Sequence, residues 1–122
     1  MYDLARLSDD LERDEGFRAV AYDDADGAPI RPGSAVRGHP TVGIGWALDV
    51  NPLSHDRART ILGWHVDDKS AELFAALPWA RGLDEVRCRA LVNMAFNLGV
   101  HGLLGFHLML EALRTARWAD AA

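Results

Sequence analysis

Two acidic residues and one hydroxyl residue have types and spacing that favour acid–base chemistry. Glu15 ends an amphipathic stretch, and Asp24 follows nine residues later within a turn-like segment. Thr41 then opens a short β-branched run that contains Gly43 and Gly45. Hydrolysis of a glycosidic bond needs one carboxylic acid to protonate the leaving oxygen and a second carboxylate to direct water or attack the anomeric carbon. These residues therefore favour a glycosidase-type site, provided that the fold holds them together.

The same acids have a second interpretation as ordinary surface residues. A general acid must stay protonated near neutral pH, which requires a raised pKa, and neighbouring negative charges and partial burial favour that state. Other acids do surround the two candidates, at positions 14, 23 and 26. However, clustered acids near helix ends and turns are usually solvated, so the spacing alone leaves both interpretations open.

The elements expected around these residues are a helix and a hairpin. Residues 1–14 have leucines at helical spacing and predict a first helix that ends near Gly16, because glycine suits a helix C-terminus. Residues 17–50 form a hairpin lobe, with strands over residues 17–22 and 41–46. The segment 28–40 is rich in proline and glycine and predicts an extended loop inserted in, or beside, this hairpin.

Residues 54–122 predict a helical lobe. Ser54 is a good N-cap for one long helix or two, with Gly63 as the point that loosens it, and Asp84 is a good N-cap for a helix that reaches about Gly99. The second of these is apolar almost all round, which indicates burial on most sides. A further helix is expected from about residue 107 and includes Trp118. The fold class is therefore α+β and mostly helical, in a single domain over residues 1–122.

Composition excludes several classes of function. The formal net charge is −5, whereas nonspecific nucleic-acid binding needs a basic face, so no nucleic-acid partner is expected. The N-terminus has no signal-peptide pattern, and no apolar run reaches membrane-spanning length. Cys88 is the only cysteine and is expected to pack as a small hydrophobe. The segment that starts at Asp24 is like the start of a calcium-binding loop, but no glutamate follows at the position that such a loop requires. The histidines do not have the spacing of metal ligands, so no metal is expected.

Two separate blocks of the sequence resemble the phage-type lysozymes, glycoside hydrolase family 24. The first block is Glu15-Gly16-Phe17-Arg18, Tyr22, Asp24 and Thr41-Val42-Gly43-Ile44-Gly45. The second is Asn93-Met94-Ala95-Phe96-Asn97-Leu98-Gly99, followed by Gly105-Phe106 and Arg117-Trp118. Because both blocks come in the family's order over most of the chain, the resemblance implies a lysozyme-like fold with a small hairpin lobe and a helical C-terminal lobe.

The resemblance also implies roles for individual residues. Glu15 matches the general acid, Asp24 the second catalytic carboxylate, and Thr41 the threonine that helps to position the attacking water. The two hairpin glycines, at 43 and 45, match those that let the sugar approach the backbone. Phe96 matches a substrate-cleft aromatic, although a plain core residue fits this position nearly as well. The implied activity is muramidase cleavage of the β-1,4 bond between N-acetylmuramic acid and N-acetylglucosamine with inversion. The implied partner is peptidoglycan, with no cofactor, after synthesis in the host bacterial cytoplasm and with action in the periplasm and cell wall.

The chain departs from the family pattern in three places. Asp24 and Thr41 are 17 positions apart, so segment 28–40 is an insertion that extends the cleft or contacts the peptide stem. Trp46 stands where the family commonly has a histidine. Family members also continue well beyond the tryptophan that matches Trp118, so the helical lobe is expected to be incomplete. This leaves open a truncated or decayed gene, a self-associating variant, a wall-binding remnant with impaired catalysis, or a lytic module of a larger virion protein.

Overall fold

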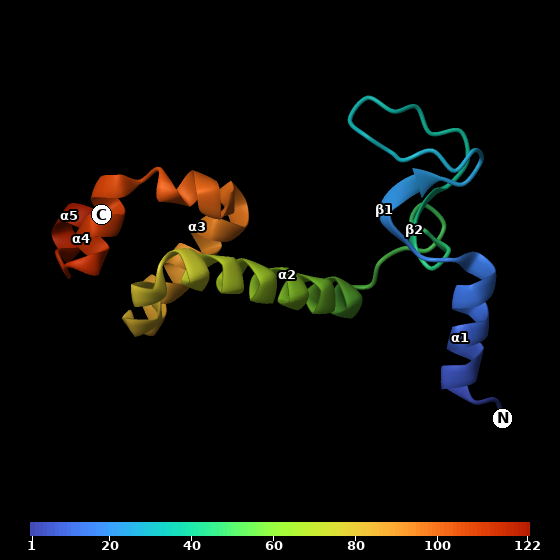
Figure 1. The fold of residues 1–122 in the computed structure, drawn as a ribbon, viewed down its shortest axis with the longest axis horizontal. Helices are drawn as coiled ribbons and strands as arrows, with labels where there is room; N and C mark the ends of the chain where they lie inside the picture. The colour runs from blue at the N-terminus through green and yellow to red at the C-terminus, as the bar shows by residue number, and fades with distance from the viewer. The chain divides into compact units, whose positions relative to one another are not determined.

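The computed structural model describes all 122 residues and divides into two compact units at Ser54 and His55 (Figure 1). The first unit contains one helix and a three-stranded sheet: α1 (Leu4–Glu15), β1 (Arg18–Asp23), β2 (Pro40–Gly43) and β3 (Trp46–Ala47). The second is helical: α2 (His55–Ala76), the 3-10 helix η1 (Pro78–Gly82), α3 (Glu85–Leu104), α4 (His107–Arg114) and α5 (Trp118–Ala121). The α+β, mostly helical fold class expected from the sequence is confirmed.

Helix α1 is defined by a cap at each end. The Asp3 side chain accepts a hydrogen bond from the Arg6 N–H at 3.1 Å, which satisfies one of the free amides at the helix start. At the other end Gly16 adopts φ +73°, and its N–H donates to the Glu12 carbonyl at 2.8 Å. The helix thus begins three residues later and ends one residue later than the predicted span 1–14, and Glu15 is its last residue.

The sheet is antiparallel, with β2 in the centre between β1 and β3. Thr41 pairs with Tyr22 on one side and with Ala47 on the other. The prediction of one return strand over residues 41–46 is wrong, because the chain turns between β2 and β3. Gly43 and Gly45 take φ values of +69° and +66°, which glycine adopts at little cost, so the strand reverses within three residues.

The residues between β1 and β2 form a loop inside the hairpin, at positions 24–39, so the predicted loop boundary at residue 40 is one position too late. The first part of the loop folds back on β1. Its Ile30 N–H donates to the Ala21 carbonyl at 2.9 Å, and the Asp23 N–H donates to the Ala28 carbonyl at 2.9 Å. An isolated β-bridge also joins Tyr22 to the loop. Residues 28–30 of the insertion are therefore hydrogen-bonded to the strand that precedes them.

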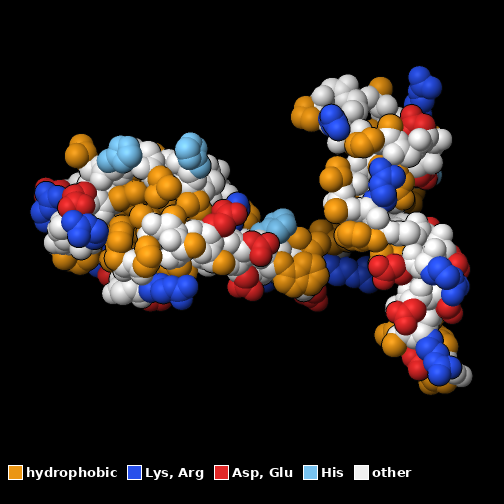
Figure 2. All heavy atoms as spheres, in the orientation of Figure 1, with side chains coloured by type: hydrophobic (Ala, Val, Ile, Leu, Met, Phe, Trp, Pro, Cys, Tyr) orange, Lys and Arg blue, Asp and Glu red, His pale blue; other side chains and the backbone are white.

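The helical unit has its own hydrophobic core, which joins α2, η1, α3 and α4. Its buried members are Leu73, Ala80, Leu91, Ala95, Leu103 and Leu110. Helix α2 is continuous through Gly63, so that glycine does not divide it as the sequence allowed. Hydrophobic side chains also remain visible on the outer surface of this unit (Figure 2).

Helix α3 follows its prediction in extent but not in burial. Asp84 caps it as expected by accepting the Arg87 N–H at 3.1 Å, and Gly99 interrupts it with non-helical angles (φ 74°, ψ 155°) before a short further helical segment that reaches Leu104. Burial on most sides is wrong, since Leu98 is 50% exposed and only three residues of α3 are buried. The apolar composition of this helix overstated its burial because one face of it lies outside the core.

The last helix predicted from the sequence is in fact two helices. Helix α4 ends at Arg114, and Ala116 takes φ +58°, which interrupts the helix before α5 begins at Trp118. The Trp118 ring then lies under the guanidinium of Arg87, 4.0 Å from the ring centroid. This cation–π contact fastens α5 to the start of α3.

The hydrophobic core predicts the effect of removing one of its leucines. Leu91 is 2% exposed on α3, so Leu91→Ala should lower the free energy of unfolding of the helical unit by about 2–5 kcal/mol. Leu108→Ala is the matched control, because Leu108 is 88% exposed and its replacement should cost under about 0.5 kcal/mol. Urea unfolding followed by circular dichroism measures both, and equal losses would contradict this assignment of the core.

No single helix in the structure has the length and apolar content to cross a membrane. Helices α3 and α4 taken together meet that criterion by length and composition alone, but they are bent by 103° at the break between them.

Candidate functional site

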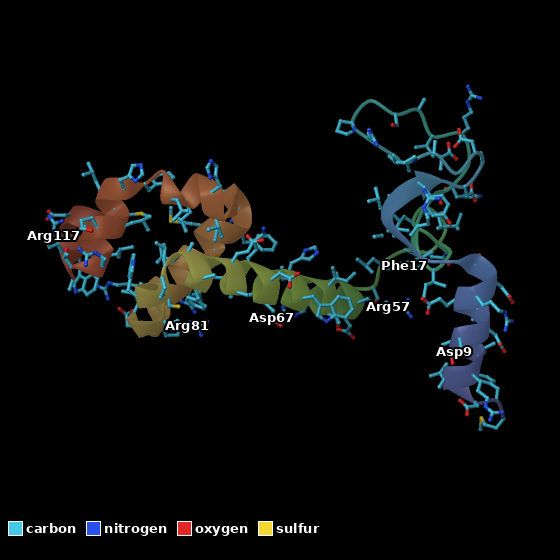
Figure 3. All side chains as sticks on the ribbon, in the orientation of Figure 1. Asp9, Phe17, Arg57, Asp67, Arg81 and Arg117 are labelled. Atoms are coloured by element: carbon cyan, nitrogen blue, oxygen red, sulfur yellow. The ribbon has the colours of Figure 1, made fainter.

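Glu15 lies where α1 meets the turn between β2 and β3. It is exposed, and Gly16 and Phe17 connect it to the sheet; Phe17 is labelled in Figure 3 and is 62% exposed. A Cβ atom placed on Gly45 would lie 2.8 Å from Glu15 Oε2 and 3.2 Å from its carboxyl carbon. The Glu15 carboxylate therefore packs against the backbone of the turn at Gly45, where a larger residue would collide with it.

Asp24 directly follows β1 and is fastened to the far end of the loop. Its Oδ1 accepts the His39 N–H at 2.6 Å, and its own N–H donates to the His39 carbonyl at 3.1 Å. This reciprocal pair of hydrogen bonds fixes the orientation of the carboxylate even though 15 positions separate the two residues.

Thr41 is the second residue of β2 and is 4% exposed. Its hydroxyl donates to the His39 carbonyl at 3.0 Å. Because a hydroxyl has one proton and two lone pairs, this bond leaves Thr41 Oγ1 as an acceptor only. Any contact with water would consequently be one in which the water donates.

The structure brings most of the predicted site residues into one unit. Glu15 contacts Gly45, and His39 joins Asp24 to Thr41. The other glycine, at position 43, has open space at its Cβ position. The predicted cleft aromatic Phe96 belongs to the helical unit, where it lies on α3 and is 39% exposed.

Asp23, which the sequence indicates only as one of the acids around Glu15 and Asp24, is a central residue of this unit. It is 4% exposed, and its carboxylate accepts three backbone hydrogen bonds, from Arg37 at 2.7 Å, Gly38 at 2.9 Å and Ala25 at 3.0 Å. These amides, that of Arg37 first, stabilise the charged carboxylate and lower the pKa of Asp23 below its ordinary value. Two of its three partners lie 14 and 15 residues away, so only the Ala25 contact had a local signal in the sequence.

His39 and Asp49 form an ion pair beside these residues. His39 Nδ1 lies 2.8 Å from Asp49 Oδ2, and both side chains are about half exposed. Hydrogen bonding to Asp49 and the negative charge of Asp49 and Asp24 raise the pKa of His39, while the hydrogen bond from His39 lowers the pKa of Asp49. This ion pair links the C-terminal end of the loop to the segment that follows β3.

This pair predicts a specific dependence on pH. His39 contributes stability that is fully present below its ordinary pKa of 6.5 and is lost as pH rises through its higher folded-state pKa. Asp49 contributes stability that is present above 3.8 and is lost as pH falls through its lower folded-state pKa. The ion pair is therefore fully formed between these two values.

Asp49→Asn should lower the pKa of His39 toward 6.5, because it removes the charge that favours the imidazolium form. Titration of the His39 ring protons by NMR measures the shift directly. Asp26→Asn is the matched control, since Asp26 lies in the same loop but contacts only the Ala28 N–H. An unchanged His39 titration in Asp49→Asn would contradict the ion pair.

No group of three or more histidine, cysteine, aspartate or glutamate side chains converges in a way that could hold a metal ion. The acids of the site instead face backbone amides, as described for Asp23 and Asp24. The chemistry that this arrangement can supply is thus proton transfer and the orientation of water by carboxylates and a hydroxyl.

Comparison with known proteins identifies the family. The family described as phage lysozyme matches residues 12–122. A probable T4-type lysozyme 1 of Dictyostelium discoideum is 38% identical over 42 residues, which cover 34% of this chain and 25% of that protein. The pre-baseplate central spike protein Gp5 of Enterobacteria phage T4 is 26% identical over 132 aligned positions, which cover 94% of this chain and 23% of that protein. The alignments thus span about a quarter of each relative's length, and the family match extends from the last turn of α1 to the last residue. The chain belongs to the phage lysozyme family.

Proposed function

We propose that this protein is a glycoside hydrolase that cleaves peptidoglycan as an endo-N-acetylmuramidase. The bond cleaved is the β-1,4 linkage between N-acetylmuramic acid and N-acetylglucosamine. The observation that carries the proposal is the position of the Glu15 carboxylate, exposed at the end of α1 and resting on Gly45. An exposed carboxylate beside an open backbone turn is accessible to a sugar, and the membership of the phage lysozyme family favours this substrate.

In the proposed reaction Glu15 donates its proton to the leaving glycosidic oxygen. Asp24 accepts a proton from the attacking water, which approaches the anomeric carbon from the opposite face of the sugar and so inverts its configuration. Thr41 orients that water by accepting a hydrogen bond from it, because the threonine hydroxyl already donates its own hydrogen bond to the His39 carbonyl. The proton lost by Glu15 is balanced by the proton taken from water, and no cofactor is required.

The substrate defines where such an enzyme works. Glycan strands of peptidoglycan are the only partner that the reaction needs, and they lie in the bacterial cell wall. The proposal therefore includes synthesis in the cytoplasm of a host bacterium and action in its periplasm and wall. The two hairpin glycines, at 43 and 45, would let a sugar approach the turn closely.

A second candidate function is supported by the alignment with the spike protein Gp5, which covers 94% of this chain. In this alternative, the chain is the lysozyme module of a larger virion protein and acts on peptidoglycan during entry. A third possibility is that the protein is a remnant of such an enzyme, which retains the carboxylates but has lost activity. It would then bind the cell wall or self-associate.

Clearing of chloroform-treated Gram-negative cells tests the activity. The enzyme is expected to lower the turbidity of the suspension, whereas an impaired remnant would sediment with the cell walls and leave the turbidity unchanged. Reading the gene on both sides of the region that encodes residues 1–122 distinguishes a free enzyme from a module of a spike-like protein.

A further inference from the structure

The Asp23 carboxylate is the most enclosed charged group of the first unit. It is 4% exposed, and its two oxygens accept three backbone N–H groups at 2.7–3.0 Å. One of these amides, of Ala25, begins the loop, and the other two, of Arg37 and Gly38, end it. A buried carboxylate retains its charge only when hydrogen bonds replace water, and these three do so. Asp23 therefore links the two ends of the loop through hydrogen bonds.

The residue next to this link connects it to two proposed catalytic groups. His39 follows Arg37 and Gly38 directly, and its N–H donates to Asp24 Oδ1 at 2.6 Å. The carbonyl of the same residue accepts the Thr41 hydroxyl at 3.0 Å and the Asp24 N–H at 3.1 Å. Asp23 and Asp24 thus hold three consecutive amides, of residues 37, 38 and 39, along one side of the loop.

The packing at Gly38 shows how closely the two ends of the loop approach each other. A Cβ atom on Gly38 would collide with Asp24 Oδ1 and would lie 2.8 Å from both Asp23 Oδ1 and the Ala25 nitrogen. The segment 37–39 therefore lies directly against residues 23–25, with no space for a side chain. A small displacement of this segment would move the groups that hold Asp24.

We propose that Asp23 is a positioning residue for the hydrolytic reaction, which holds segment 37–39 so that His39 orients the Asp24 carboxylate and the Thr41 hydroxyl. The inference rests on the proposed function and assigns a role to a residue that has no part in the proton transfers. It also assigns a role to the inserted loop, which supplies the His39 amide that orients Asp24 and the Arg37 and Gly38 amides that bind Asp23.

Asp23→Asn tests the proposal with little change in shape. In this variant one carboxylate oxygen becomes an NH₂ group, which cannot accept a hydrogen bond. At least one of the three backbone N–H groups then loses its acceptor and faces another donor. We expect kcat on soluble glycan strands to fall by about 10- to 100-fold, because displacements of about 1 Å have that effect, while KM changes less than about twofold. Asp26→Asn is the control, since Asp26 caps only the Ala28 N–H in the same loop, and its kcat should equal that of the wild type.

Two further readouts separate positioning from a general loss of stability. In an Asp24→Asn background, Asp23→Asn should cause a smaller loss of kcat than in the wild type, because residues that act through one another are not additive and only the effect on Thr41 is left. Hydrogen exchange of the His39 amide should accelerate by at least about tenfold in Asp23→Asn and not in Asp26→Asn, if both variants retain the wild-type circular dichroism spectrum.

The outcomes distinguish this inference from the proposed function. A wild-type protein that hydrolyses no peptidoglycan overturns both. An active wild type with an equally active, folded Asp23→Asn variant, or with fully additive losses in the double variant, overturns only the positioning role. Should Asp23→Asn fail to fold, Gly38→Ala pushes the same segment away from residues 23–25, because its Cβ would collide with the atoms of those residues. The same loss of kcat then supports the proposal, and wild-type kcat overturns it.

Discussion

Replacing Glu15 with glutamine is expected to lower the rate of peptidoglycan hydrolysis by about 10²–10⁴-fold, the contribution typical of a general acid. Glutamine keeps the size and hydrogen-bonding capacity of the side chain but has no acidic proton to give to the leaving oxygen. Since Glu15 is exposed at the end of α1, the change should leave the free energy of unfolding within about 0.5 kcal/mol of the wild-type value. Turnover of purified peptidoglycan and thermal unfolding measure the two quantities.

Glu12→Gln is the matched control for this prediction. Glu12 lies one turn earlier on the same helix, and only its backbone carbonyl has a structural role, as the acceptor of the Gly16 N–H. The same chemical change at this position should leave hydrolysis unaffected. If both variants lose activity equally, or if Glu15→Gln remains fully active, the general acid is another residue.

Gly45→Ala is expected to lower hydrolysis by about 10- to 100-fold because it displaces the Glu15 carboxylate, and misplacement of a catalytic group by about 1 Å has such an effect. A Cβ on Gly45 would lie 2.8 Å from Glu15 Oε2, which is too close for the carboxylate to stay in place. The exposed glutamate can rotate away, so the collision affects the position of the acid more than the stability of the fold.

Gly43→Ala isolates this effect from backbone strain. Both glycines have left-handed φ values, +69° at Gly43 and +66° at Gly45, so each alanine should cost about 1–2 kcal/mol of stability. At Gly43, however, the added Cβ meets nothing within 4 Å. The two variants should therefore melt alike. Gly43→Ala affects only the space left for the sugar and should change KM, whereas Gly45→Ala also displaces Glu15 and should lower kcat. Equal kcat in both would show that the contact between Gly45 and Glu15 has no influence on the chemical step.

Features that depend on near neighbours were predictable from the sequence. Gly16 ends α1 and Asp84 caps α3, because caps act over three or four residues and use recognisable residue types. The position of Glu15 at the end of a helix followed from the same reasoning. The family resemblance, carried by two short blocks, is confirmed by the match over residues 12–122.

Features that depend on distant hydrogen bonds were not predictable in this way. The burial of Asp23 requires amides 14 and 15 residues away, and no local pattern distinguishes it from Asp24 or Asp26 beside it. The break between β2 and β3 was also missed, because two glycines in a β-branched run fit a weak strand as well as a turn. The apolar composition of α3 indicated a core helix but not which of its faces is covered.

The assignment of the catalytic roles to Glu15, Asp24 and Thr41 remains a prediction that the geometry supports to different degrees. Glu15 is exposed and rests on an open turn, as a group that meets a substrate should. Asp24 is held in a fixed orientation by His39. Thr41 is buried, and its proton is committed to the backbone, which restricts it to accepting a hydrogen bond.

The most direct test of the central claim is the chemical identity of the new ends in digested peptidoglycan. After incubation with the protein, the products are reduced with borohydride and examined by mass spectrometry. The proposed muramidase reaction predicts new reducing ends on N-acetylmuramic acid, formed by the wild type and not by Glu15→Gln. New reducing ends on N-acetylglucosamine, anhydro ends on muramic acid, or the absence of any new ends would contradict it.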